Sequence, residues 1–163
     1  MSDSIGLEKL QINSTEYSYN LGYPLWHLED VLLPLFHEHF TYDSLRETIL
    51  SANHTWCAYR NGKCLACALM TDVGSQGGLY LLLFGVRRSA QGYGIGKNLL
   101  EHLLQWARNT DYKFIYLHTE HENFKAIRMY EKAGFRKEVY QPEGFDQLPN
   151  LGTDAVSMIF FFA

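Results

Sequence analysis

An apolar, strand-like run is followed directly by a glycine turn and an amphipathic helix, and this succession constrains the fold more than any other feature. The run is GGLYLLLFGV, residues 77–86, and the turn after it carries Gly92, Gly94 and Gly96. Apolar residues then recur at helical spacing over residues 99–107. A nearly continuous apolar run is typical of a strand covered on both faces, so we expect helices on both sides of a sheet.

The other periodicities predict the element order β-αα-βββ-α-β-α-ββ, which is that of an α/β layered domain. An Asn-Gly pair at residues 61–62 predicts a tight hairpin, and Gly134 is placed to end a helix. Thr41 can cap the second helix, and Pro34 predicts a break or bend in the first. The expected elements, in order, are residues 7–12, 28–40, 41–50, 55–60, 63–70, 77–86, 99–107, 113–119, 124–133, 135–140 and 155–162.

The composition suits one packed domain over residues 1–163. Of the 163 residues, 47% are hydrophobic and 15% are aromatic, which supplies ample apolar surface for a core. The net charge of -4 gives no general attraction to nucleic acid or to an anionic membrane, and it favours a substrate with positive charge. The apolar stretches are too short to span a bilayer, and the N-terminus has no signal-peptide pattern. We therefore expect a cytoplasmic protein with neither nucleic-acid nor membrane partners.

The 3 cysteines are Cys57, Cys64 and Cys67, an odd number that is typical of a reducing compartment. Cys64 and Cys67 could form half of a metal site or a redox pair, but their spacing in a regular strand would point them to opposite faces. We expect buried, small apolar side chains instead. The histidine pairs lack a third ligand at a suitable spacing, so no metal site is predicted.

The glycine loop does not fit the common nucleotide-binding motifs. A Walker A loop would need glycine where Gln91 stands and a hydroxyl residue where Asn98 stands, and a G-x-G-x-x-G motif would need glycine at Lys97. What remains is Gln-x-x-Gly-x-Gly, residues 91–96, between a buried strand and a helix. Backbone N–H groups at a helix N-terminus suit a pyrophosphate. A plain glycine-rich turn is the alternative at this point.

Two stretches together resemble the signatures of the GNAT superfamily of acetyl-CoA-dependent N-acetyltransferases. VRRSAQGYGIGKNLL is similar to the pyrophosphate-binding loop of that family, and YLHTEHENFKAIRMYEKAGF is similar to its second signature. The resemblance implies a GNAT fold, with a mixed central sheet of about seven strands, splayed central strands and about four flanking helices. It also implies acetyl-CoA as the acetyl donor and CoA as the product.

The resemblance further implies which residues contact the cofactor. The backbone of Phe84 and Val86 would contact the pantetheine arm, the N–H groups of residues 91–97 would surround the pyrophosphate, and Asn123 would contact the pantetheine. Arg87 and Arg88, which follow the strand, could meet a CoA phosphate or be solvated. The implied cofactor-binding residues are Phe84, Gly85, Val86, Gln91, Gly92, Tyr93, Gly94, Ile95, Gly96, Lys97, Asn123, Ala126 and Tyr130.

The implied chemistry requires a base, a proton donor and a neutral amine. By the same resemblance Tyr130 donates a proton to the CoA sulfur, while its alternative role is that of a core tyrosine. The strands resemble those of NatE-type N-terminal acetyltransferases, which implies that Tyr80 and His118 act together as the base through an ordered water. A hydrogen-bonded structural histidine is the alternative for His118, and Glu120, on the same strand face, is the substitute base. In regular strands Tyr80 shares a face with Leu82 and Phe84.

The acceptor implied by this resemblance is the α-amino group of a protein or peptide N-terminus. An apolar-Pro-apolar triplet resembles the first-residue pocket of those enzymes, although it could equally be a bent core helix. Those enzymes tend to carry two adjacent tyrosines after the sixth strand, which hold the peptide backbone. This chain has Tyr140 followed by Gln141 and then a longer loop. The implied substrate-binding residues are Leu33, Pro34, Leu35, Leu82 and Tyr140. Small amines, a non-catalytic acyl-CoA-binding module, an auxiliary subunit and a homodimer remain open.

Overall fold

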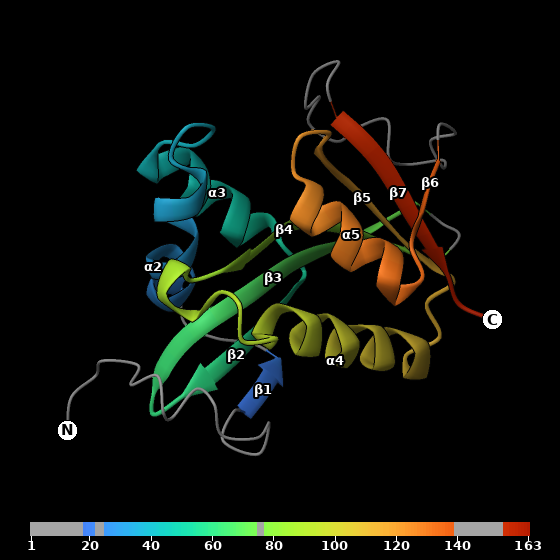
Figure 1. Cartoon of the computed structure of the whole chain (residues 1–163), viewed down its shortest axis with the longest axis horizontal. Helices are drawn as coiled ribbons and strands as arrows, with labels where there is room; N and C mark the ends of the chain where they lie inside the picture. The colour runs from blue at the N-terminus through green and yellow to red at the C-terminus, as the bar shows by residue number, and fades with distance from the viewer. Residues whose placement is uncertain (1–17, 22–24, 75–76, 139–154) are drawn as a thin grey trace.

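The central sheet has seven strands in the order β1-β2-β3-β4-β5-β7-β6 (Figure 1). The computed structural model describes residues 18–21, 25–74, 77–138 and 155–163. All neighbouring strands pair antiparallel except β4 and β5, which are parallel. The strands are β1 (Ser18–Leu21), β2 (His54–Arg60), β3 (Lys63–Val73), β4 (Gly78–Val86), β5 (Phe114–Glu120), β6 (Arg136–Lys137) and β7 (Ala155–Phe161).

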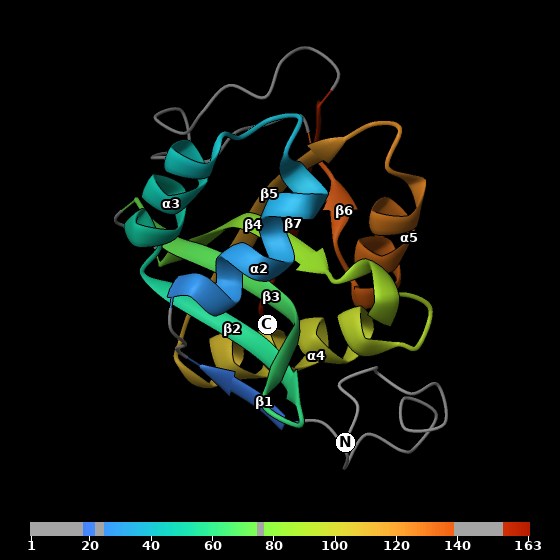
Figure 2. The same cartoon turned by 90° about the vertical axis from the view of Figure 1, so that its left-hand side faces the viewer.

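Helices cover both faces of this sheet, as the apolar β4 sequence predicts. Helices α2 and α3 pack over β2, β3 and β4 on one face, and α4 and α5 pack on the other (Figures 1 and 2). The helices of the described residues are α2 (Leu25–Phe36), α3 (Tyr42–Ser51), the 3-10 turn η2 (Arg88–Ala90), α4 (Ile95–Asn109) and α5 (Phe124–Ala133). From α2 onward the observed order of elements is the predicted one, whereas β1 (Ser18–Leu21) is a strand that the sequence patterns did not predict.

Local sequence signals account for most of the element boundaries. Asn61 and Gly62 have φ values of 51° and 77° and join β2 to β3, as predicted for an Asn-Gly hairpin. The Thr41 side chain accepts a hydrogen bond from the Ser44 N–H and begins α3. Gly134 adopts a φ of 114° and ends α5. The strand predicted at residues 7–12 lies outside the described residues.

Pro34 is part of α2, and the helix ends at Phe36, earlier than the predicted end at residue 40. Proline in the last turns of a helix crowds the preceding turn and removes a backbone donor, so an early end is the expected effect. The side chain of His37 reaches back to the Pro34 carbonyl, with 3.1 Å between Nδ1 and O. This contact helps to satisfy the carbonyl groups at the end of the helix.

A bulge in β3 brings the three cysteines together. Ala58 pairs with Ala66 and Tyr59 with Cys64, so Leu65 is an extra residue that reverses the alternation of side chains. Cys64 and Cys67 therefore lie on the same face, with Cys57, beneath α2 and α3. The prediction that Cys64 and Cys67 point to opposite faces is wrong for this reason. The prediction that these thiols are free and buried is confirmed.

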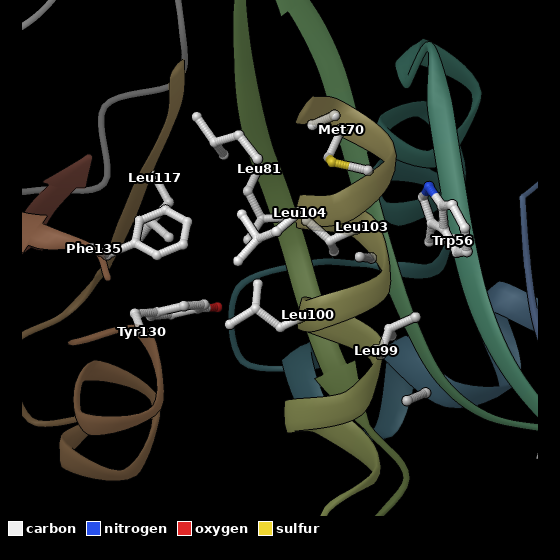
Figure 3. Close-up of a cluster of buried hydrophobic side chains, with 14 of the residues drawn as sticks. Trp56, Met70, Leu81, Leu99, Leu100, Leu103, Leu104, Leu117, Tyr130 and Phe135 are labelled. Carbon is white, nitrogen blue, oxygen red and sulfur yellow. The ribbon is translucent and has the colours of Figure 1, made fainter. Parts of the chain in front are cut away.

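The core between the sheet and α4 is built from the predicted helical stripe. Leu99, Leu100, Leu103 and Leu104 are buried against Met70 and Leu81 of the sheet (Figure 3). Burying a leucine side chain contributes about 2 kcal/mol, so this stripe fixes α4 against β3 and β4. The N-terminus of α4, where the glycine loop ends, is held in place by the same packing.

Candidate active site

The parallel strands β4 and β5 separate halfway along their length, as predicted. Their pairing begins at Gly78–Phe114 and ends at Leu81–Leu117, while each strand continues beyond this point. Leu82 is the extra residue of a bulge, because Leu81 pairs with Met70 and Leu83 pairs with Leu69. The bulge coincides with the point at which the strands separate.

The bulge also divides the β4 side chains between the two faces of the sheet. Tyr80 and Leu82 lie on the face covered by α2, whereas Phe84 and Val86 pack on the face covered by α4. The prediction that Tyr80, Leu82 and Phe84 share one face is therefore wrong. The inserted residue reverses the alternation that a regular strand would have. We call the stretch beyond Leu81–Leu117, where β4 and β5 no longer pair, the gap.

Tyr80 and His118 are in contact on the α2 side of this gap. The Tyr80 hydroxyl and His118 Nδ1 are 2.8 Å apart, and the Tyr116 ring packs against both side chains. Tyr80 is buried, with 3% exposed, and burial raises its pKa well above the ordinary value near 10. Burial also lowers the pKa of His118 from its ordinary value of 6.5. At neutral pH the pair is therefore a neutral phenol and a neutral imidazole.

Glu120 lies in a different environment from His118. Its carboxylate is 3.5 Å from His39 Nε2, and both of these side chains are 56% exposed. This contact joins the turn after α2 to the end of β5. Glu120 therefore contacts His39 at the surface, whereas His118 contacts Tyr80 in the interior.

Tyr130 lies on the opposite face of the sheet from Tyr80. Its ring packs edge-on against Phe84, with ring centroids 6.2 Å apart, and its hydroxyl points toward Leu100 of α4 (Figure 3). The side chain is 5% exposed, and burial raises its pKa well above the ordinary value. The hydroxyl therefore stays protonated and is suited to donating a proton. Its packing is that of a core tyrosine as well.

The three loop glycines serve two different purposes. Gly92 and Gly94 have φ values of 88° and 81°, with open space where a side chain would be, so their requirement is conformational. At Gly96 the packing leaves little room for a side chain, because a Cβ there would lie 3.0 Å from Val86 Cγ2. Together they form a turn that ends at the N-terminus of α4, where backbone N–H groups and the helix dipole suit an anion.

The backbone beyond the bulge has polar groups that face the gap. The Arg87 N–H donates to the Leu65 carbonyl on β3, with 2.7 Å between N and O. Backbone groups alternate between the two edges of a strand, so those of Val86 and Phe84 face away from β3 and toward β5. The Gln91 side chain donates to the Val86 carbonyl at 2.9 Å and so ties the loop to the strand.

Gly85 and Asn123 each have a structural role that the sequence reasoning missed. A Cβ at Gly85 would lie 2.8 Å from Leu35 Cδ1, so this glycine lets α2 pack closely on β4. The Asn123 side chain accepts from the Ala126 N–H and caps α5, and Asn123 therefore precedes the helix rather than lying within it. An Asn directly before a helical pattern is a recognised capping signal and could have revealed this role.

The residues expected to line the acceptor side converge in part. Leu33 and Leu35 of α2 are half-buried against the cluster that includes Leu82 of β4, and Pro34 is exposed between them. Leu82 also contacts the cluster of Tyr80 and Tyr116, so the α2 wall adjoins the tyrosine–histidine pair. Tyr140 lies outside the described residues.

Among the described residues, no group of three or more His, Cys, Asp or Glu side chains is placed to hold a metal ion. In the same part of the chain, none of the helices is long and apolar enough to cross a membrane.

Comparisons with known proteins give the family. Residues 19–135 match the profile of the acetyltransferase (GNAT) family, whereas no curated protein sequence matches the chain. Ard1 from Thermoplasma volcanium superposes with a TM-score of 0.73 at 19% identity, covering 91% of this chain and 99% of that one. The Escherichia coli ribosomal-protein-S18-alanine N-acetyltransferase gives 0.70 at 19% identity, covering 90% and 94%. A Bacillus subtilis acetyltransferase in complex with CoA gives 0.70 at 18%, covering 90% and 99%.

At these identities the solved structures show that the fold is shared, and the profile match over residues 19–135 adds the family. The splayed parallel strands, the glycine turn at the start of α4 and the buried tyrosine of α5 lie within the matched range. The chain therefore belongs to the GNAT family of acetyl-CoA-dependent acetyltransferases.

Proposed function

We propose that this enzyme transfers an acetyl group from acetyl-CoA to the α-amino group of a protein or peptide N-terminus. The single observation that carries the proposal is the 2.8 Å contact between Tyr80 and His118 at the point where β4 and β5 separate. A base at this position serves an amine that approaches from the α2 side of the sheet.

The residues of the α4 side bind the donor. The N–H groups of the turn at residues 91–97 hold the pyrophosphate, and the backbone of Phe84 and Val86 holds the pantetheine arm in the gap. The fit is supported by open space at Gly92 and Gly94 and by the close approach of α4 at Gly96. When bound, acetyl-CoA supplies the acetyl thioester and the thiolate that leaves.

The acceptor amine attacks from the opposite face through the gap. All 3 cysteines of the chain are buried and none lies at the gap, so the acetyl group passes directly to the amine in a ternary complex. An α-amino group has a pKa of about 7.7–8.0, so a neutral imidazole is strong enough to take its proton near neutral pH, directly or through a water.

His118 takes up the proton of the amine, either through Tyr80 or directly. The raised pKa of Tyr80 disfavours a phenolate, whereas the imidazole of His118, even with its pKa lowered by burial, binds a proton more readily than a phenol does. In one arrangement Tyr80 donates to His118 Nδ1 while its oxygen accepts a proton from the acceptor side. In the other arrangement, His118 Nδ1 donates a hydrogen bond to Tyr80, and His118 Nε2 accepts the proton from the acceptor amine. In both, the proton is held on His118.

Tyr130 donates the second proton. Its hydroxyl lies on the donor face beside Phe84, and its raised pKa keeps it protonated until the thiolate develops. A base on one face and an acid on the other match the direction of the reaction, since the amine loses a proton on one side while the sulfur gains one on the other.

Two features support a peptide acceptor. The α2 wall of Leu33 and Leu35 adjoins the base through Leu82, which suits an apolar first side chain. The E. coli structural neighbour is named as an N-acetyltransferase of an alanine in a ribosomal protein. A small, strongly cationic amine would gain little from such an apolar wall.

The test is a CoA-release assay over a panel of peptides that differ in the first residue, with free polyamines, amino sugars and amino acids as comparators. We expect peptides with an apolar first residue to give the highest kcat/KM. N-terminally blocked versions of the same peptides are the matched controls and should give no release above background.

Faster turnover of a small amine than of any peptide would contradict the acceptor assignment and leave the donor assignment intact. Turnover of the blocked peptides would place the acceptor on a side-chain amine instead. Acetyl-CoA binding without release for any amine would identify a non-catalytic module.

A further inference from the structure

Arg87 follows β4 directly and connects three parts of the molecule. Its Nε and Nη2 atoms donate to the Cys64 carbonyl of β3 at 3.0 and 2.8 Å, and Nη2 also donates to the Asp30 carboxylate of α2 at 2.7 Å. The side chain is 17% exposed. Its guanidinium group therefore points toward β3 and α2.

Arg88 makes a second contact with the same helix. Its Nη2 donates to the Pro34 carbonyl, 3.3 Å away, near the C-terminal end of α2. A cation at this end of a helix is favourable, because the last carbonyls carry partial negative charge and lack helical partners. Two adjacent arginines thus hold α2 at two positions one helical turn apart.

Between these contacts the Leu32 and Leu35 side chains of α2 pack on the backbone of β4 at Gly85. A Cβ at Gly85 would approach Leu35 to 2.8 Å and Leu32 to 3.1 Å, so the helix packs directly on the strand that precedes the loop. Movement of α2 away from β4 would break the arginine contacts and open this packing. The position of the α2 wall therefore depends on Arg87 and Arg88.

We infer that Arg87 and Arg88 are positioning residues for the acceptor, and that they do not bind CoA phosphate. The inference rests on the proposed function in taking α2 as the acceptor wall. Both arginines begin the segment that leads to the glycine loop, where a cation would ordinarily be assigned to a phosphate. The contacts of Arg87 with Cys64 and Asp30 already use Nε and Nη2, so that edge of the guanidinium is not free to bind a phosphate through two hydrogen bonds.

Asp30→Asn provides the sharpest test, because it weakens the Arg87 contact from the α2 side without changing the loop. We expect Asp30→Asn, Arg87→Gln and Arg88→Gln each to raise the acceptor KM about three- to tenfold, with acetyl-CoA affinity by calorimetry within about twofold of the wild type. Arg88→Lys should recover most of the loss, since a lysine can still donate to the Pro34 carbonyl.

Hydrogen exchange of the α2 amides gives a readout that needs no acceptor. All three disruptive variants should exchange faster near residues 30–36 than the wild type does, while α4 remains protected. Arg108→Gln, at the far end of α4, and Asp43→Asn, on α3, are the matched charge controls and should change neither measurement.

A rise of more than about tenfold in the acetyl-CoA dissociation constant for Arg87→Gln and Arg88→Gln, with Asp30→Asn unaffected, would identify the arginines as phosphate ligands and overturn the inference. Unchanged exchange in α2 would also overturn it. If no amine is acetylated by the wild type, the proposed function fails, and the exchange experiment still decides whether the arginines hold α2.

Discussion

The hydroxyl of Tyr80 meets Nδ1 of His118 across the first position at which β4 and β5 no longer pair. Tyr80 lies opposite Tyr116 in the last paired stretch, and His118 follows Leu117, the final paired residue of β5. The hydrogen bond of 2.8 Å thus spans the point where the strands begin to separate. The proposed base therefore lies where the pairing of β4 and β5 ends.

Replacing His118 should abolish most of the chemistry. We expect His118→Ala to lower kcat about a hundredfold to ten-thousandfold, and Tyr80→Phe to lower it less, since the phenylalanine keeps the packing but removes the proton path. Steady-state kinetics with saturating acetyl-CoA measures this. Glu120→Gln is the control and should keep kcat within about threefold. A larger loss in Glu120→Gln than in His118→Ala would make Glu120 the base.

The free energy of unfolding should depend on pH through His118. Its pKa is lowered in the folded protein, so below the ordinary value of 6.5 the unfolded chain binds a proton that the folded protein does not. Stability should therefore fall as the pH is lowered from 6.5 toward the folded pKa, and be unaffected by this group above 6.5. Denaturant unfolding of wild type and His118→Gln between pH 5 and pH 7.5 measures the difference. Parallel curves would count against a buried neutral imidazole.

Removing the Tyr130 hydroxyl should affect kcat and leave donor binding intact. Tyr130→Phe retains the packing against Phe84 and Leu100, so we expect about a tenfold to hundredfold lower kcat with little change in the KM for acetyl-CoA. The wild-type kcat should not decline up to pH 10 through loss of the Tyr130 proton, because burial raises the pKa of this group. An unchanged kcat in Tyr130→Phe would leave Tyr130 as a core residue only.

Substitutions at two glycines with similar backbone geometry can distinguish backbone strain from a loss of acetyl-CoA binding. Gly94 and Gly62 have φ values of 81° and 77°, and neither has an atom within 4 Å of the added Cβ. Gly94→Ala and Gly62→Ala should each lower the free energy of unfolding by about 1–2 kcal/mol, because alanine is strained at such angles. Only Gly94→Ala should also weaken acetyl-CoA binding by calorimetry. Equal affinities in the two variants would show that the loop does not hold the pyrophosphate.

The close packing of α4 on β4 can be tested by a substitution at Gly96. Gly96→Ala places a methyl group 3.0 Å from Val86 Cγ2, in the contact between α4 and β4. We expect a lower melting temperature and weaker acetyl-CoA binding together, since α4 must shift to admit the methyl group. Thermal unfolding with and without acetyl-CoA measures both effects, and a stabilising effect of the ligand equal to that in the wild type would disprove the coupling.

Features that depend on near neighbours in the chain could be predicted from the amino-acid sequence. The Asn61-Gly62 hairpin, the Thr41 cap, the Gly134 helix end and the leucine stripe of α4 were predicted, because each follows from local backbone conformation or helical periodicity. The motif around the glycine loop and the α5 signature also gave the family, since those residues are close together in sequence.

The face that each residue occupies after a bulge could not be predicted, because it depends on how the strands pair in the folded sheet. Leu65 and Leu82 are ordinary apolar residues, and their extra position exists only relative to the register of the neighbouring strand. Because of that register, Phe84 lies on the face covered by α4, and Cys64 lies on the same face as Cys67. Likewise, nothing near Arg87 in the sequence indicates Asp30, because 57 residues separate the partners of that hydrogen bond. Such contacts depend on how the layers pack, and the packing is a property of the whole chain.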